Sequence, residues 1–107
     1  MVSLLVLTNL PDLMSAEALA TTLIEARLAA WVNLRAPCRS IYRGQGKVET
    51  SDEIPLLIKT TEARYAALEA AIRAQHPYEL PEVIAIPITH GLPDYLGWVA
   101  AETRLPD

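Results

Sequence analysis

The stretch His76-Pro77-Tyr78-Glu79-Leu80-Pro81-Glu82 decides how the chain folds, and Val83–Ile88 follows it directly. Proline cannot continue a helix and pushes the residue before it toward an extended backbone, so the two prolines predict a stiff loop. Val83–Ile88 is short, apolar and mostly β-branched, which favours a buried strand. The stretch therefore turns the chain from a helix end into a strand. It also holds an imidazole, a phenol and two carboxylates in one loop.

Length and composition limit the classes of protein to consider. A chain of 107 residues is long enough for one domain with its own core, so we expect a single domain over residues 1–107. The net charge of −4 argues against a nucleic-acid partner, because phosphate binding needs clustered Lys and Arg. Cys38, the single cysteine, excludes an internal disulfide framework. No signal peptide or membrane span is predicted, so we expect a cytoplasmic protein without a membrane partner.

The helices and the first strand follow from the spacing of apolar residues. Val2–Leu7 is apolar on both faces, which predicts a central strand that is covered on both sides. Residues 15–30 repeat apolar side chains at helical spacing, with Ser15 as the expected N-cap. Two further helices are predicted over residues 61–75 and 94–103.

A long hairpin is predicted in the middle of the chain. Residues 31–42 form one arm, with a bulge at Pro37, and residues 48–60 form the other. Gly44-Gln45-Gly46 supplies the turn, either as a tight turn or within a longer loop. An arm of roughly a dozen residues would reach on the order of 40 Å. The outer half of the hairpin therefore extends beyond any core that one subunit offers, which predicts that it packs against another subunit.

The order of the predicted elements gives the fold class. Strand, helix, strand, strand, helix, strand and a final helix follow one another along the chain. This order predicts an α+β, ferredoxin-like split βαβ fold with an antiparallel sheet, helices on one face and an extended hairpin between the second and third strands.

Five motifs give the sequence a specific resemblance. They are, in chain order, Ala29-Ala30-Trp31-Val32-Asn33, Ser40-Ile41-Tyr42 with Gly46-Lys47, Leu57-Ile58-Lys59-Thr60-Thr61, the His76–Glu82 stretch and Pro93-Asp94-Tyr95-Leu96-Gly97-Trp98. Together they resemble the CutA family of divalent-cation-tolerance proteins over nearly the whole chain. The resemblance implies a ferredoxin-like protomer in a tight homotrimer, with an architecture related to PII signalling proteins. It also implies a link to copper and other divalent metals and no enzymatic activity.

Three departures from the family pattern concern the metal. The family often has Cys where this chain has Trp31, and Trp where it has Gly44. In members that bind copper through a thiol after the first strand and two adjacent histidines, those positions correspond to Thr8, Gln75 and His76. Of that set, only His76 keeps the residue type that the resemblance connects with copper.

His76 and Cys38 are the candidate metal ligands, since imidazole and thiolate suit copper. Each has a structural alternative. His76 ends a helix, where the dipole favours a positive charge. Cys38 sits at an apolar position of a strand and is expected to be packed there. We expect copper, or another divalent cation, to bind through His76 with help from a carboxylate or from a residue of a neighbouring subunit.

The remaining candidates are residues for ligand or interface contacts: Tyr78, Glu79, Glu82, Tyr42 and Lys47. No residue is predicted to be catalytic. Three arginines of the hairpin could bind an anion, but cross-hairpin ion pairs with acidic residues explain them more simply. The residues concerned are Arg35, Arg39, Arg43, Glu49, Asp52 and Glu53.

These features favour a trimeric divalent-cation-tolerance or metal-response protein. The alternative is a PII-like trimer that binds a small ligand or acts as a signalling scaffold, without a metal function of its own. A phosphatase of acyl phosphates would need an arginine in the loop after the first strand, and Thr8–Pro11 has none. An RNA-recognition module would need aromatic residues on its central strands, and Val2–Leu7 has none.

Overall fold

The computed structural model describes residues 2–105 and contains five strands and three helices. In chain order these are β1 (Ser3–Leu10), α1 (Leu13–Glu25), β2 (Trp31–Leu34), β3 (Cys38–Gly44), β4 (Lys47–Thr61), α2 (Glu62–Gln75), β5 (Ile84–Ile88) and α3 (Pro93–Glu102).

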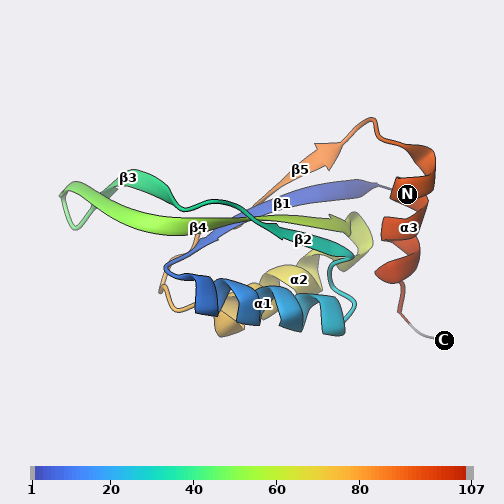
Figure 1. The fold of residues 1–107 in the computed structure, drawn as a ribbon, viewed down its shortest axis with the longest axis horizontal. Helices are drawn as coiled ribbons and strands as arrows, with labels where there is room; N and C mark the ends of the chain where they lie inside the picture. The colour runs from blue at the N-terminus through green and yellow to red at the C-terminus, as the bar shows by residue number, and fades with distance from the viewer. Residues whose placement is uncertain (1, 106–107) are drawn as a thin grey trace.

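The strands form one antiparallel sheet in the order β2-β4-β1-β5, and β3 pairs with the outer half of β4. Helices α1 and α2 lie side by side beneath one face of this sheet, and α3 stands at one end of it (Figure 1). This arrangement confirms the predicted α+β, ferredoxin-like fold with helices on one face.

The core lies between the two long helices and the sheet. Alternate residues of β1 and β4 point toward the helices, as expected for strands that are half buried. The fully buried large side chains of this layer are Val6, Leu10, Leu19, Leu23, Leu56, Ile58, Leu68 and Ile72. The predicted central position of β1 is confirmed by its pairing with β4 on one side and β5 on the other.

The opposite face of the sheet is apolar but only partly covered. Leu7 lies opposite Leu57 on β4 and Ile84 on β5, so these three side chains share this face. Ile84 and Ile86 are 49% and 46% exposed. The prediction that the first strand is covered on both sides is therefore wrong for the single subunit. We call this face, defined by Leu5, Leu7, Leu57, Ile84 and Ile86, the open sheet face.

Two boundaries differ from those that the sequence predicts. The single strand expected over residues 31–42 is divided into β2 and β3 by Arg35–Pro37. Pro37 has no N–H to donate to a ladder, so it interrupts the strand where only a bulge was expected. The strand expected to end at Leu7 continues to Leu10, where it still pairs with Ile54.

Helix α1 also begins and ends earlier than predicted. Asp12, not Ser15, is its N-cap, because an Asp12 carboxylate oxygen accepts the Ser15 N–H at 2.8 Å. The helix ends at Glu25 since Arg27 takes a left-handed backbone with φ 57°, and Leu28 N then donates to Leu23 O at 2.9 Å.

The hairpin has a tight two-residue turn. Gln45 and Gly46 both have positive φ, 52° and 79°, and Gly44 pairs with Lys47 across them. Such a turn matches the twist of the flanking strands. The hairpin extends past the ends of α1 and α2 (Figure 1), and the molecule measures 47 × 26 × 22 Å.

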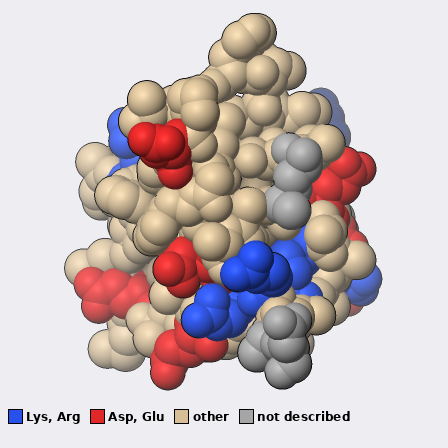
Figure 2. All heavy atoms as spheres, turned by 90° about the vertical axis from the view of Figure 1, so that its right-hand side faces the viewer, with Lys and Arg blue, Asp and Glu red and all other residues tan. Residues whose placement is uncertain are grey.

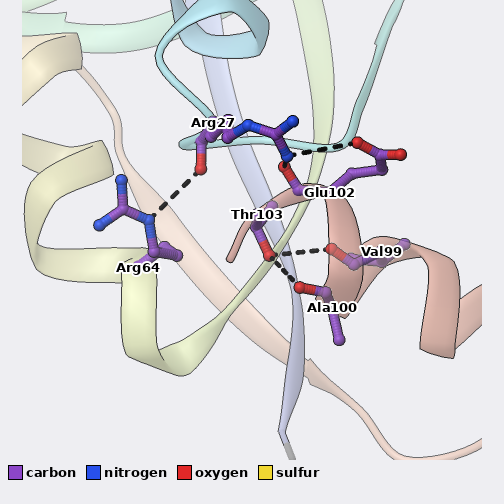
Figure 3. A network of polar contacts seen from close by, with 6 residues as sticks. All are labelled: Arg27, Arg64, Val99, Ala100, Glu102 and Thr103. Atoms are coloured by element: carbon purple, nitrogen blue, oxygen red, sulfur yellow. Dashed lines mark hydrogen bonds and ion pairs between the residues drawn. The ribbon is translucent and has the colours of Figure 1, made fainter. Parts of the chain in front are cut away.

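Polar contacts join the three helices at the far end from the hairpin (Figure 3). Arg27 Nη1 donates to the backbone oxygen of Glu102 at 3.2 Å and lies 3.4 Å from its carboxylate. Arg64 Nε donates to the backbone oxygen of Arg27 at 3.3 Å. Residues at the C-terminal end of α1, on α2 and on α3 are therefore linked through one arginine.

Aromatic rings fasten α3 to the start of β2. Trp31 meets Tyr95 and Trp98 edge to face, each with ring centroids 5.9 Å apart. Lys59 lies over the Trp31 ring at 6.0 Å and donates to the side-chain oxygen of Asn33. Trp31 therefore anchors the last helix to the sheet.

Candidate functional site

A cleft lies between the stem of the hairpin and the His76–Glu82 loop. Its volume is about 700 Å³, which is within the usual range for small-molecule sites. Its polar wall comes from β1, β3, β4 and the loop, through Asn9, Tyr42, Ser51, Glu53, Tyr78 and Glu82. The fold thus brings three of the sequence-predicted ligand or interface residues, Tyr42, Tyr78 and Glu82, to one place.

His76 fixes the loop on the end of β1. The residue is 7% exposed, and its Nε2 lies 2.7 Å from the backbone oxygen of Asn9. Its Nδ1 accepts the backbone N–H of Tyr78 at 3.1 Å. An N–H can only donate, so Nδ1 is the acceptor and Nε2 carries the hydrogen that is donated to Asn9. Both ring nitrogens of a neutral imidazole are therefore in use within the subunit.

Tyr78 forms one wall of the cleft. Its ring lies 4.8 Å from the His76 ring, centroid to centroid. Burial raises the pKa of its phenol to about 12, with further contributions from a hydrogen bond to Glu53 and from the nearby charges of Glu53, Tyr42 and Asp12. The phenol therefore keeps its proton at neutral pH and is a hydrogen-bond donor on this side of the cleft, near the Glu53 carboxylate.

Glu53 is the buried charge of the cleft, since its exposed fraction is only 8%. The predicted cross-hairpin ion pair is confirmed for Arg39, whose Nε lies 3.2 Å from the Asp52 carboxylate. It is wrong for Glu53, which pairs with Cys38 across the ladder and therefore points to the other face of the hairpin. The two ion pairs of the described residues, Arg27–Glu102 and Arg39–Asp52, leave Glu53 without a basic partner.

Neutral groups hold the remaining polar side chains of the cleft. Asn9 Nδ2 donates to the Glu82 carboxylate at 3.2 Å. The hydroxyls of Tyr42 and Ser51 are 2.9 Å apart and share a hydrogen bond. Sequence reasoning missed Asn9, Ser51 and the role of Glu53. Alternation along β4 separates Glu53 from Asp52, but only the β3–β4 register places Glu53 on the face of Tyr42.

The other sequence-predicted site residues lie outside this cleft. Glu79 is exposed in the loop, and Lys47 is exposed beside the hairpin turn. Cys38 was expected to be packed, and this is wrong for the single subunit: it starts β3 as an exposed free cysteine. The break at Pro37 places it beyond the part of the sheet that the helices cover.

The candidate metal ligands are not gathered into one site. Within residues 2–105, no group of three or more His, Cys, Asp and Glu side chains could hold a metal ion. Thr8, at the position where the resemblance would want a thiol, is buried on the helix side of β1, and its hydroxyl has no partner among the described residues. His76 uses both of its nitrogens in hydrogen bonds. One subunit therefore does not provide a ready-made copper site.

The surface around α3 mixes both signs of charge. Figure 2 shows that end of the molecule, where acidic and basic side chains lie next to one another in the lower half and most of the upper half is uncharged. This pattern differs from the stripe of Lys and Arg that nucleic-acid-binding proteins present. None of the helices in the described part of the chain has both the length and the apolar character needed to cross a membrane.

Comparison with known proteins identifies the family. The model of the CutA1 divalent ion tolerance protein family matches residues 4–102. This range includes all of the helices and strands described above, except for Ser3 at the start of β1. The chain belongs to this family. The membership confirms the resemblance seen in the motifs, and it confirms that the protein is a divalent-cation-tolerance homologue and not an enzyme.

Individual CutA proteins are similar in sequence and in structure. The divalent-cation tolerance protein CutA of Thermus thermophilus is 42% identical over 98 residues, which cover 92% of this chain and 95% of the relative. The crystal structure of CutA1 from Oryza sativa superposes with a TM-score of 0.94 at 39% identity, covering 97% of this chain and 95% of the other. A structure described as the periplasmic divalent cation tolerance protein CutA of Archaeoglobus fulgidus gives 0.92 at 32% identity, covering 95% and 99%.

Proposed function

We propose that this CutA protein acts as a homotrimer in the response to divalent metal ions. The observation that carries the proposal is the family match over residues 4–102, which includes the hairpin and the His76–Glu82 loop. The membership supports the metal-response role, and the fold supplies physical support for the trimer that the sequence resemblance implies.

The support for a trimer is the amount of apolar surface that one subunit leaves uncovered. The open sheet face presents Ile84 and Ile86 at about half exposure, and the hairpin presents Ile41 and Val48 at 69% and 68%. Monomeric proteins rarely expose contiguous apolar surface of this kind, whereas obligate interfaces are large and apolar. A neighbouring subunit that covers both regions would remove them from water.

Copper requires a different argument, because the described residues of one subunit do not fit it. A metal at His76 would have to take a ring nitrogen that now bonds to Asn9 or Tyr78. We therefore propose that any copper site uses His76 only with ligands from a second subunit. Cys38 is exposed and available for such a contact.

The experiment combines mass and metal binding on the purified protein. Light scattering should give three times the 11.7 kDa subunit mass at micromolar concentration, and a stable monomer would refute the trimer. Copper titration by calorimetry should show weaker binding for His76→Ala or for Cys38→Ser than for the parent. If neither substitution changes the titration, both residues are structural with respect to copper.

A second candidate function is a PII-like trimer that binds a small ligand. The cleft at Glu53 favours it, because a volume of about 700 Å³ with convergent polar groups is typical of a ligand site. The compartment stays a prediction as well: the sequence favours the cytoplasm, while the Archaeoglobus fulgidus relative is described as periplasmic.

A further inference from the structure

The cleft between the hairpin stem and the His76–Glu82 loop has a negative charge. Glu53 and Glu82 both line it, and none of the described residues in its wall is Lys, Arg or His. Asp12 is near enough for its charge to act on Tyr78 as well. The negative charge of the cleft therefore attracts positively charged ligands and disfavours anions.

The two carboxylates have neutral partners and spare acceptor capacity. Asn9 donates to Glu82 at 3.2 Å, and the neutral phenol of Tyr78 is the group near Glu53. A carboxylate accepts about four hydrogen bonds, so each has room for further donors. Glu53 is 8% exposed, and burying a carboxylate without a cation costs free energy that a charged donor would recover.

The rest of the wall suits an organic cation better than a metal ion. The rings of Tyr42 and Tyr78 and the apolar side chains of Leu80 and Pro81 line the same space. Aromatic faces attract ammonium and guanidinium groups, and apolar side chains cover a carbon chain. Calcium and magnesium need about six oxygen ligands in a compact shell, which two carboxylates separated by phenols do not supply.

We propose that this cleft binds a small organic cation, with an ammonium or guanidinium group hydrogen-bonded to Glu53 between Tyr42 and Tyr78. A second positive group at the other end of the ligand would lie at Glu82, near the surface. This site is separate from the metal-response role, because it uses neither His76 nor Cys38 as a ligand.

The test is calorimetric titration of the purified protein with 1,4-diaminobutane and with agmatine, which carry one or two ammonium groups on a short chain. The uncharged 1,4-butanediol, of the same length, is the matched ligand control. We expect one cation bound per subunit and no measurable heat of binding for the diol. Glu53→Gln should weaken binding roughly tenfold or more, because it removes a charged hydrogen-bond acceptor but keeps the shape.

Asp52→Asn is the matched protein control. Asp52 neighbours Glu53 in the sequence but lies on the other face of β4, paired with Arg39 and outside the cleft. It should leave the affinity unchanged. Glu82→Gln, a change at an exposed position, should weaken binding several-fold and tests the second carboxylate of the cleft independently of Glu53.

Three outcomes would overturn the proposal. The first is that neither cation binds at millimolar concentration. The second is that Glu53→Gln and Asp52→Asn weaken binding equally, which would show diffuse electrostatic attraction only. The third is that Glu53→Gln steeply lowers the thermal midpoint of the ligand-free protein. In the last case a basic side chain of a neighbouring subunit already neutralises Glu53. A negative result in these cation titrations does not affect the interpretation of the copper titration, so the two proposals are tested separately.

Discussion

At the scale of the residue, His76 shows how one side chain can join two segments that are far apart in the sequence. It ties the loop at Tyr78 to the end of β1 at Asn9, and the imidazole is buried while both bonds are partly buried. His76→Ala should therefore lower the free energy of unfolding by about 2–3 kcal/mol, since two buried polar groups lose their partner. Chemical denaturation monitored by circular dichroism measures this loss.

His90→Ala is the control for that experiment. His90 is exposed and bonds only to the adjacent Thr89, so its removal should change stability by no more than about 0.5 kcal/mol. If His76→Ala is as stable as the parent, the two hydrogen bonds contribute nothing to the free energy of unfolding. The imidazole could then bind a metal without loss of stability.

The same scale shows what the sequence can reveal of a site. The prolines of the His76–Glu82 loop made its stiffness predictable, and Tyr78 and Glu82 do reach the cleft. Glu53 could not be assigned in this way, because its neighbours in sequence are Asp52 and Ile54, which face other directions. Only the register of β3 against β4 decides which carboxylate meets Arg39 and which meets Tyr78.

At the scale of the element, boundaries were harder to predict than elements. Helix α2 runs to Gln75 as expected, because its periodic apolar positions end at a proline-containing loop. The start of α1 was misplaced, since Ser15 and Asp12 are both good N-caps and only the folded backbone shows which one accepts the N–H. Pro37 likewise is compatible with a bulge in one strand or with a break between two strands. The structure has a break, with β2 ending at Leu34 and β3 beginning at Cys38.

The N-cap of α1 gives a prediction about pH. The hydrogen bonds from the backbone and the side chain of Ser15 lower the pKa of Asp12 below its ordinary value of 3.8. The charged form is thus favoured in the folded state, so its stabilisation is fully present above pH 3.8 and is lost as the pH falls through the lowered pKa. Asp12→Asn keeps a capping oxygen without the charge.

The thermal midpoint of Asp12→Asn should therefore lie below that of the parent at neutral pH, and the difference should shrink in acid. Asp12→Ala removes the cap altogether and should be the least stable of the three at neutral pH. Scanning calorimetry from acid to neutral pH measures the thermal midpoints of the parent, Asp12→Asn and Asp12→Ala. A difference between parent and Asp12→Asn that does not depend on pH would show that the charge of Asp12 contributes nothing to the cap.

At the scale of the whole molecule, the hairpin makes the subunit longer than its core requires. The radius of gyration is 14.4 Å, whereas about 13 Å is usual for a compact domain of this length. Beyond the helices, the ladder of β3 and β4 exposes Ile41 and Val48, and its outer edge has unpaired backbone groups. An edge of this kind is protected when it extends the sheet of another subunit, and head-to-tail contacts close into a ring when the rotation from one subunit to the next is a third of a turn.

A shortened hairpin tests whether this extension holds the trimer together. Deleting residues 41–44 and 47–50 leaves the Gln45-Gly46 turn between Ser40 and Ser51, which already face each other across the ladder. Because the same number of residues leaves each strand, the register of the remaining pairs and the faces of their side chains are kept. The loss is confined to the part of the hairpin that extends beyond the helix-covered core.

The shortened protein should elute as a smaller species on a sizing column and should unfold at a much lower temperature than the parent. The physical reason is that the open sheet face alone would then have to hold three subunits, without the strand pairing and the apolar contacts of Ile41 and Val48. Gln45→Asn, which changes the turn but keeps both arms, is the control and should leave the assembly intact. If the shortened chain keeps both the trimer and its unfolding temperature, the apolar sheet faces are sufficient for assembly and the hairpin is not its clasp.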